Sequence, residues 1–174
     1  MPDSCPVWSL DDLYEGVDSR ALKADMAECH KAAKELETEW RGRLGELTAN
    51  QLIDVIKSYE TILERLGKVQ SHAQLLFAAN TNDAAIAKHH QSVREVGAEI
   101  GAALLFVELE LAKIDEGDMT VLLKASGLKH FAPWLRRVRA MAPFQLSDEI
   151  EKMIAERSPT GSGAWVRLFD ETTT

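Results

Sequence analysis

Two long apolar stripes, in residues 48–79 and 83–114, constrain the fold of this 174-residue chain most strongly. In both, apolar side chains recur at alternating steps of three and four, which places them on one face of a helix. A strand would require alternation by two. The first stripe comprises Leu52, Val55, Tyr59, Ile62, Leu66, Val69, Ala73 and Leu76. The second comprises Ile86, His90, Val93, Gly97, Ile100, Leu104, Val107, Leu111 and Ile114. At 1.5 Å of rise per residue, each helix is about 45 Å long.

The segment Asn80-Thr81-Asn82 between the stripes favours a turn, so the two helices are expected to fold back as an antiparallel hairpin. A third long helix is predicted from Asp18, a favourable N-cap, to about Arg43. Its apolar face comprises Leu22, Met26, Cys29, Ala33, Leu36 and Trp40.

Beyond Ile114 the pattern changes to short pieces. One short helix is expected to begin at Asp118 and to stop at Gly127, and another has Pro133 in its first turn. A third follows Ser147, and a last one begins near Ala164. The first of these helices runs through Met119, Val121, Leu122 and Leu123. In the next two, the side chains expected to face inward are Trp134, Leu135, Val138, Met141, Ile150, Met153 and Ile154. The predicted fold is all-α and bundle-like.

The sequence divides into three parts. Residues 1–17 contain Pro2, Pro6 and Gly16 and read as an irregular arm, which is expected to pack across the helices with Trp8 as its anchor. Residues 18–157 form the helical domain, and residues 158–174 read as a linker and the start of a helix.

One part of the second long helix is apolar almost all round. Residues 102–107 follow Gly97 and Gly101, two small residues that would let another helix approach closely. Such a segment needs several neighbours or a partner that is missing.

No constellation for catalysis or metal binding is recognisable. None of the five histidines begins a His-Glu-x-x-His motif or follows a Glu at the di-iron spacing. Neither a P-loop nor a G-x-S-x-G elbow occurs. We therefore predict no catalytic, cofactor-binding or metal-ligating residue in this chain. His90 is interpreted as a structural histidine of the core stripe, and Cys29 as a buried free thiol, which fits a reducing compartment.

The formal net charge of -8 argues against general nucleic-acid binding. Residues 119–147 nevertheless carry five basic side chains and no acidic one: Lys124, Lys129, Arg136, Arg137 and Arg139. This stretch is either a phosphate-binding patch or, as we favour, a basic face that meets an acidic neighbour, with Phe131 and Trp134 in the core. No run is long and apolar enough to span a membrane, and the N-terminus lacks a signal-peptide pattern, so a cytoplasmic protein is expected.

Two segments resemble one enzyme family. Trp8-Ser-Leu-Asp-Asp-Leu-Tyr14 looks like the N-terminal signature of oligoendopeptidase F-type enzymes, a branch of the thimet oligopeptidase-related zinc metallopeptidases. The stretch that begins Leu146-Ser-Asp-Glu-Ile-Glu-Lys-Met153 and continues to Asp170 is similar to the part of that family that leads toward the catalytic domain.

The resemblance implies an N-terminal helical domain that helps to wall a cleft for short peptides, with zinc held by a His-Glu-x-x-His motif in a catalytic domain absent from this chain. No catalytic residue or zinc ligand can be transferred to these positions, so the chain alone is expected to be inactive. Its own catalytic domain would be its partner, and residues 102–107 and 165–169 would face it. The isolated chain is also expected to be able to self-associate through uncovered apolar surface. The alternative is a stand-alone helical protein-interaction module.

Overall fold

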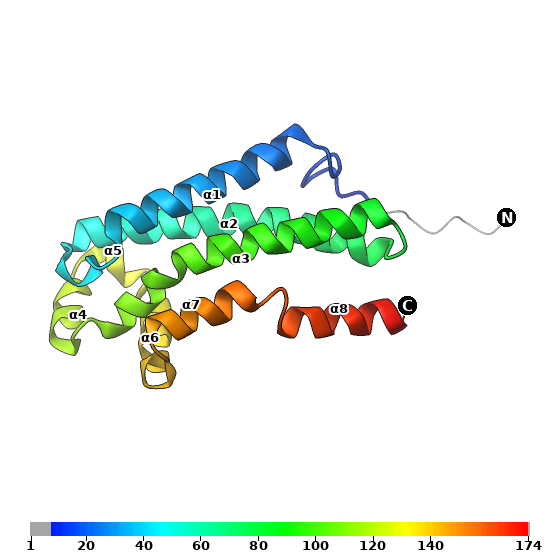
Figure 1. Cartoon of the computed structure of the whole chain (residues 1–174). Coiled ribbons are helices and arrows are strands. Elements are labelled where there is room, and N and C mark those ends of the chain that lie inside the picture. Colours follow the sequence, from blue (N-terminus) through cyan, green and yellow to red (C-terminus); the bar gives the residue numbers. More distant parts are fainter. Residues whose placement is uncertain (1–7, 174) are drawn as a thin grey trace.

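Three long helices form the frame of the molecule in the computed structural model, which describes residues 8–173 (Figure 1). They are α1 (Arg20–Trp40), α2 (Ala49–Ala79) and α3 (Ala84–Lys113). Helices α2 and α3 form an antiparallel hairpin, and α1 packs against both. The described part of the chain contains no strand. The predicted all-α fold, with a long hairpin and a further long helix, is confirmed.

Side-chain caps explain where the long helices begin. Thr48 and Gln51 form a capping box at the start of α2, and Asp83 accepts hydrogen bonds from the first backbone N–H groups of α3. The cap predicted for α1 was wrong by one residue, because Ser19 accepts the hydrogen bond from the Leu22 backbone. The Asp18 carboxylate is engaged elsewhere, in an ion pair of 2.8 Å with Lys23.

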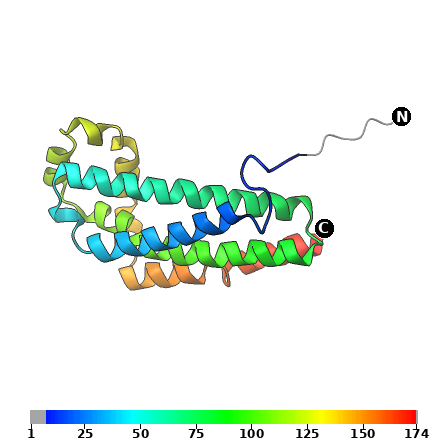
Figure 2. The same ribbon diagram turned by 90° about the horizontal axis from the view of Figure 1, so that it is seen from above.

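The remaining elements are short. They are η1 (Leu44–Glu46), α4 (Glu116–Leu122), α5 (Ser126–Lys129), α6 (Ala132–Met141), η2 (Ala142–Phe144), α7 (Asp148–Arg157) and α8 (Ser162–Thr173). Helices α4, α5 and α6 lie at one end of the long helices, whereas α7 runs along α3 and α8 continues in the same direction (Figures 1 and 2).

Two details of the short helices differ from the prediction. Asp115 rather than Asp118 is the N-cap of α4, because its carboxylate reaches the Gly117 backbone N–H at 2.7 Å. Gly127 does not stop a helix but lies within α5, where a Cβ atom would meet Ile53 Cδ1 at 2.6 Å. Its small size thus allows α5 to approach α2.

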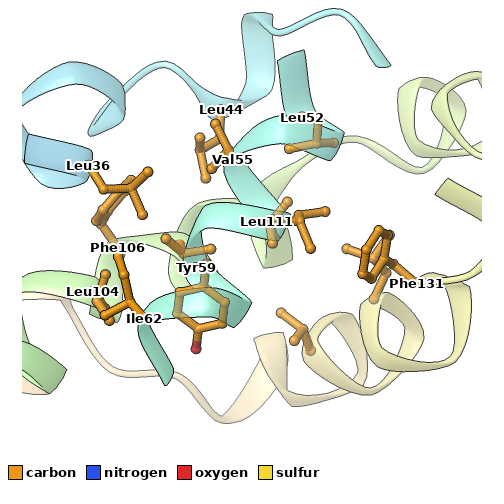
Figure 3. Packing of buried hydrophobic residues seen from close by; sticks show 14 of the residues in the cluster. Leu36, Leu44, Leu52, Val55, Tyr59, Ile62, Leu104, Phe106, Leu111 and Phe131 are labelled. Carbon is orange, nitrogen blue, oxygen red and sulfur yellow. The ribbon is translucent and has the colours of Figure 1, made fainter. Parts of the chain in front are cut away.

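The larger of two hydrophobic clusters lies where α1, α2 and α3 meet the short helices (Figure 3). It joins Leu52, Tyr59 and Leu111 of the hairpin with Phe131 and Leu135. Residues 102–107 contribute to the buried surface here and are buried or half-buried within the chain itself. Helix α3 packs against α1, α2, α6 and α7, so the expectation that residues 102–107 face a further domain was wrong.

The smaller cluster lies at the hairpin end and holds the arm. It comprises Tyr14, Leu22, Val69, Ala73 and Val93. Trp8, predicted as the anchor of the arm, is 87% exposed, and Tyr14 is the buried anchor instead. The Tyr14 hydroxyl donates to Asp25 Oδ2 at 2.7 Å, so the polar end of the buried side chain has a hydrogen-bond partner within the protein. The part of the arm prediction that concerns residues 1–7, including Cys5, lies outside the described residues.

Candidate interaction surface

Apart from His72 and His89, whose ring centroids lie 6.5 Å apart, the histidines and the thiol of the described residues are dispersed. His30 lies 3.4 Å from a carboxylate oxygen of Glu99, the ring of His90 stacks on Phe77, and His130 meets Phe131 edge-on. Among the side chains that the structure describes, in residues 8–169, 172 and 173, no group of three or more His, Cys, Asp and Glu could hold a metal ion. The residues of this part of the chain therefore do not fit a zinc site, which requires at least three such ligands.

Cys29 is a buried free thiol, as predicted. It lies in contact distance of the Ile62 backbone oxygen, with its Sγ atom donating at 3.7 Å. Burial raises the pKa of this thiol, and the thiolate is the reactive form of cysteine. Cys29 therefore has the environment of a packing residue rather than that of a nucleophile.

Arg139 gives the basic stretch a structural role. Its guanidinium donates to the Ile114 backbone oxygen and, at 2.6 Å, to Glu116, which ties α6 to the end of α3 and to α4. Trp134 stacks on Tyr59 with ring centroids 5.8 Å apart, and Phe131 is buried. For Arg139, the interpretation of a basic side chain that meets an acidic neighbour agrees with the structure. The absence of nucleic-acid binding stays a prediction.

Helix α7 is oriented opposite to the prediction. Its apolar residues Ile150, Met153 and Ile154 were expected to face inward, yet all three are exposed. The half-buried positions are instead Asp148, Glu151, Lys152 and Ala155. A helix whose apolar side faces away from the core has surface left to cover.

Polar contacts accompany this orientation of α7. The Asp148 carboxylate lies 2.7 Å from Lys113 Nζ at the end of α3, and Glu151 accepts a hydrogen bond of 2.9 Å from the Leu146 backbone. The latter bond satisfies a backbone donor ahead of the helix, as the acidic residue of a capping box does. Helix α7 thus adheres to α3 through charged and small side chains.

Helix α8 adds further exposed apolar side chains. Trp165 is 74% and Phe169 is 66% exposed, and Val166 and Leu168 are also exposed. The helix begins close to α3, since a Cβ atom on Gly163 would meet the Arg94 guanidinium and, at 2.8 Å, the Ser158 backbone oxygen.

The exposed apolar side chains of α7 and α8 are called the C-terminal apolar surface here, and comprise Ile150, Met153, Ile154, Trp165, Val166, Leu168 and Phe169. Met141 of α6 was expected to face inward and is exposed as well. Sequence periodicity identified these residues as apolar, but periodicity carries no information on which neighbour covers them.

A groove of about 350 Å³ lies between α3 and the end of α7. It is lined by Gln70, Arg94, Gly97, Ala98, Gly101, Ala155, Ser158 and Pro159. The close approach expected at Gly97 is made by the Gln70 side chain, whereas a Cβ atom at Gly101 would meet nothing within 4 Å. The two glycines therefore do not form one helix-packing seam.

These features define an all-α domain with exposed apolar side chains on α7 and α8. A family model described as Oligopeptidase F matches residues 110–174, the segment that runs from the end of α3 through α8. The resemblance to the oligoendopeptidase F-type N-terminal domain is therefore confirmed over this segment. Searches of curated proteins and of solved structures found no match.

No helix in residues 8–173 combines the length and apolarity needed to cross a membrane.

The chain is expected to self-associate through the C-terminal apolar surface, and replacing Trp165 and Phe169 together by Gln should weaken this association at least about tenfold. Each exposed aromatic side chain offers roughly 1.5–3 kcal/mol if it becomes buried against a second molecule, and 1.4 kcal/mol corresponds to a factor of ten. Sedimentation velocity over a concentration series measures the effect. Leu75→Gln, an exposed residue of α2 outside the C-terminal apolar surface, is the control. Equal association of both variants would show that another surface mediates it.

Proposed function

We propose that this chain is the non-catalytic N-terminal helical domain of an oligoendopeptidase F-type zinc metallopeptidase. The observation that carries the proposal is the family match over residues 110–174, which includes both helices of the C-terminal apolar surface. The segment that matches the family model thus contains the whole C-terminal apolar surface.

The C-terminal apolar surface would be the site at which the domain contacts its own catalytic domain. The polar side of α7 holds the helix on α3, through Asp148 and Lys113, while Ile150, Met153 and Ile154 remain available. Burying large apolar side chains provides most of the free energy of such contacts between domains.

In this arrangement the long helices would form part of the wall of a cleft that admits short peptides. Zinc and the groups that activate water would belong to the catalytic domain, because the described residues of this chain offer no metal site. The domain would contribute shape and substrate access, and we place the whole enzyme in the cytoplasm.

The purified 174-residue chain is expected to show no hydrolysis of a quenched fluorescent peptide, with or without added zinc. The product of the complete reading frame should hydrolyse the same peptide and lose this activity when zinc is removed by a chelator. Zinc-dependent hydrolysis by the purified chain alone would refute the proposed division of roles. A reading frame that encodes no His-Glu-x-x-His motif would refute the proposed parent enzyme.

A second candidate function, a stand-alone helical interaction module, would use the same C-terminal apolar surface on a separate partner. The two candidates differ in where the partner is encoded. Hydrogen exchange of α7 and α8 in the product of the complete reading frame distinguishes them. Protection of these helices relative to the 174-residue chain supports the domain, and equal exchange supports the module.

A further inference from the structure

His72 is the fully buried polar side chain in the described core, and it lies beneath the arm. Its ring meets Tyr14 edge-on, with centroids 5.3 Å apart, and the ring of His89 lies 6.5 Å away on α3. The arm, α2 and α3 therefore each contribute one ring to a small aromatic cluster at the hairpin end.

This environment favours neutral imidazoles. Neither ring nitrogen of His72, nor Nε2 of His89, has a hydrogen-bond partner of normal geometry within residues 8–173. Burial lowers the pKa of His72, which a weaker interaction with the Tyr14 backbone partly opposes. Burial also lowers the pKa of His89, and the neighbouring His72 lowers it further. Charging His72 in place would require a buried cation without a partner, and charging the half-buried His89 would leave its buried Nε2 without one.

The charged groups around the pair are already engaged with one another. Asp25 of α1 accepts the Tyr14 hydroxyl and lies 3.6 Å from Arg65 of α2. Asp18, the residue after the arm, favours a charged His89 but is paired with Lys23 of α1, which disfavours it. Lys68 of α2 lies 4.3 Å from the centroid of the Tyr14 ring and adds another positive charge. Both nearby carboxylates thus have partners that compete with an imidazolium.

The arm is the element that can move away at the lowest cost. Its backbone hydrogen bonds close on itself, from Leu13 and Tyr14 to the Leu10 oxygen and from Ser19 to the Gly16 oxygen. Its burial on the helices depends on Tyr14, because Trp8 is exposed and Leu13 only half-buried. Gly16, with φ of 143°, lies in a backbone region that other residues rarely adopt and marks the turn between the arm and α1.

We propose that residues 8–18 form a pH-sensitive latch, in which Tyr14 closes over the neutral His72–His89 pair and opens when the pair is protonated. Opening exposes both imidazoles to water, where they accept protons at their ordinary pKa. The long helices and the larger hydrophobic cluster remain folded.

The direction in which pH changes the closure of the latch follows from proton linkage. The closed state binds protons more weakly than the open state, so closure is at full strength above the ordinary histidine pKa of 6.5 and weakens as the pH falls below it. Each histidine that is neutral when closed and charged when open shifts the equilibrium up to ~tenfold per pH unit. Two such histidines shift it up to ~100-fold.

Hydrogen exchange of the 174-residue chain tests the latch, with rates corrected for their intrinsic pH dependence. Between about pH 7.5 and about pH 5.5, protection of residues 10–18 is expected to fall ~10- to 100-fold. Protection of the centres of α2 and α3 is expected to remain. Constant protection of the arm, or loss of protection throughout the chain at the same pH, would overturn the proposal.

Matched variants assign the effect to the two histidines. His72→Met with His89→Gln should abolish the pH dependence, because no group that charges between these pH values remains under Tyr14. His130→Gln changes a histidine near Phe131 and should retain it. A pH dependence that persists in the double variant would overturn the assignment.

An NMR titration of the unmodified chain provides a second, independent test of the latch if the double variant does not fold. The Tyr14 ring signals are expected to shift to those of an exposed tyrosine together with protonation of His72. A His72 ring that titrates near 6.5 while Tyr14 stays in its buried environment would overturn the proposal.

Discussion

Leu111→Ala is expected to lower the free energy of unfolding by about 2–5 kcal/mol, the largest effect of the substitutions considered for this chain. Leu111 lies on α3 with no exposed surface and packs in the larger hydrophobic cluster near Leu52 and Phe131 (Figure 3). Removing its isobutyl group loses the transfer free energy of the buried carbons and leaves a cavity that helices fixed on several sides cannot close. Urea denaturation followed by circular dichroism measures the change.

Leu75→Ala on α2 is the matched control, since it makes the same chemical change at a residue that is 47% exposed. It should cost less than about 1 kcal/mol, as surface substitutions usually do. Equal effects of the two substitutions would mean that the larger hydrophobic cluster does not carry the stability of the bundle.

Glu110→Ala is expected to cost about 1–2 kcal/mol and to loosen the connection between α1 and α2. The Glu110 carboxylate on α3 accepts hydrogen bonds from the Gly42 backbone at 2.6 Å and the Leu44 backbone at 3.2 Å. Gly42 has φ of 82°, so the turn that presents its N–H toward α3 is one that a glycine adopts readily. Without the carboxylate, both donors lose a charged acceptor.

Urea denaturation gives the stability change of Glu110→Ala, and the exchange rates of the Gly42 and Leu44 amide hydrogens report the local effect. Glu64→Ala, on the exposed side of α2, controls for the loss of one negative charge and of helix-surface contacts. If the two variants exchange equally at Gly42 and Leu44, the carboxylate does not hold this turn.

Periodicity predicted the long helices because each has a nearly complete apolar stripe and a recognisable beginning. Thr48 and Asp83 cap α2 and α3, and the residues of both stripes next to the larger cluster are buried as expected. These features depend on residues close in the sequence. The position of the short helices depends on contacts between distant segments, and here the inward sides predicted for α7 and for Met141 were wrong.

The α7 part of the candidate surface was predicted in composition but not in place. The sequence showed that Ile150, Met153 and Ile154 form an apolar face, and general rules then place such a face on the core. In the structure, Lys113 and Asp148 hold the other side of α7 on α3. His72 was missed for a different reason. The stripe predicted for α2 passes through Val69 and Ala73 and skips His72, although its imidazole is buried beside Tyr14.

The two hydrophobic clusters are unequal, and they divide the length of α2 and α3 between them. The larger contains the N-terminal half of α2 and the C-terminal half of α3, while Val69, Ala73 and Val93 of the smaller lie toward the hairpin loop. Fluctuations should therefore begin at the tip formed by residues 80–83 and travel inward, because fewer apolar contacts oppose separation there. The opposite end, covered by α4 to α6, would stay folded, and the two helices would pair again from that end.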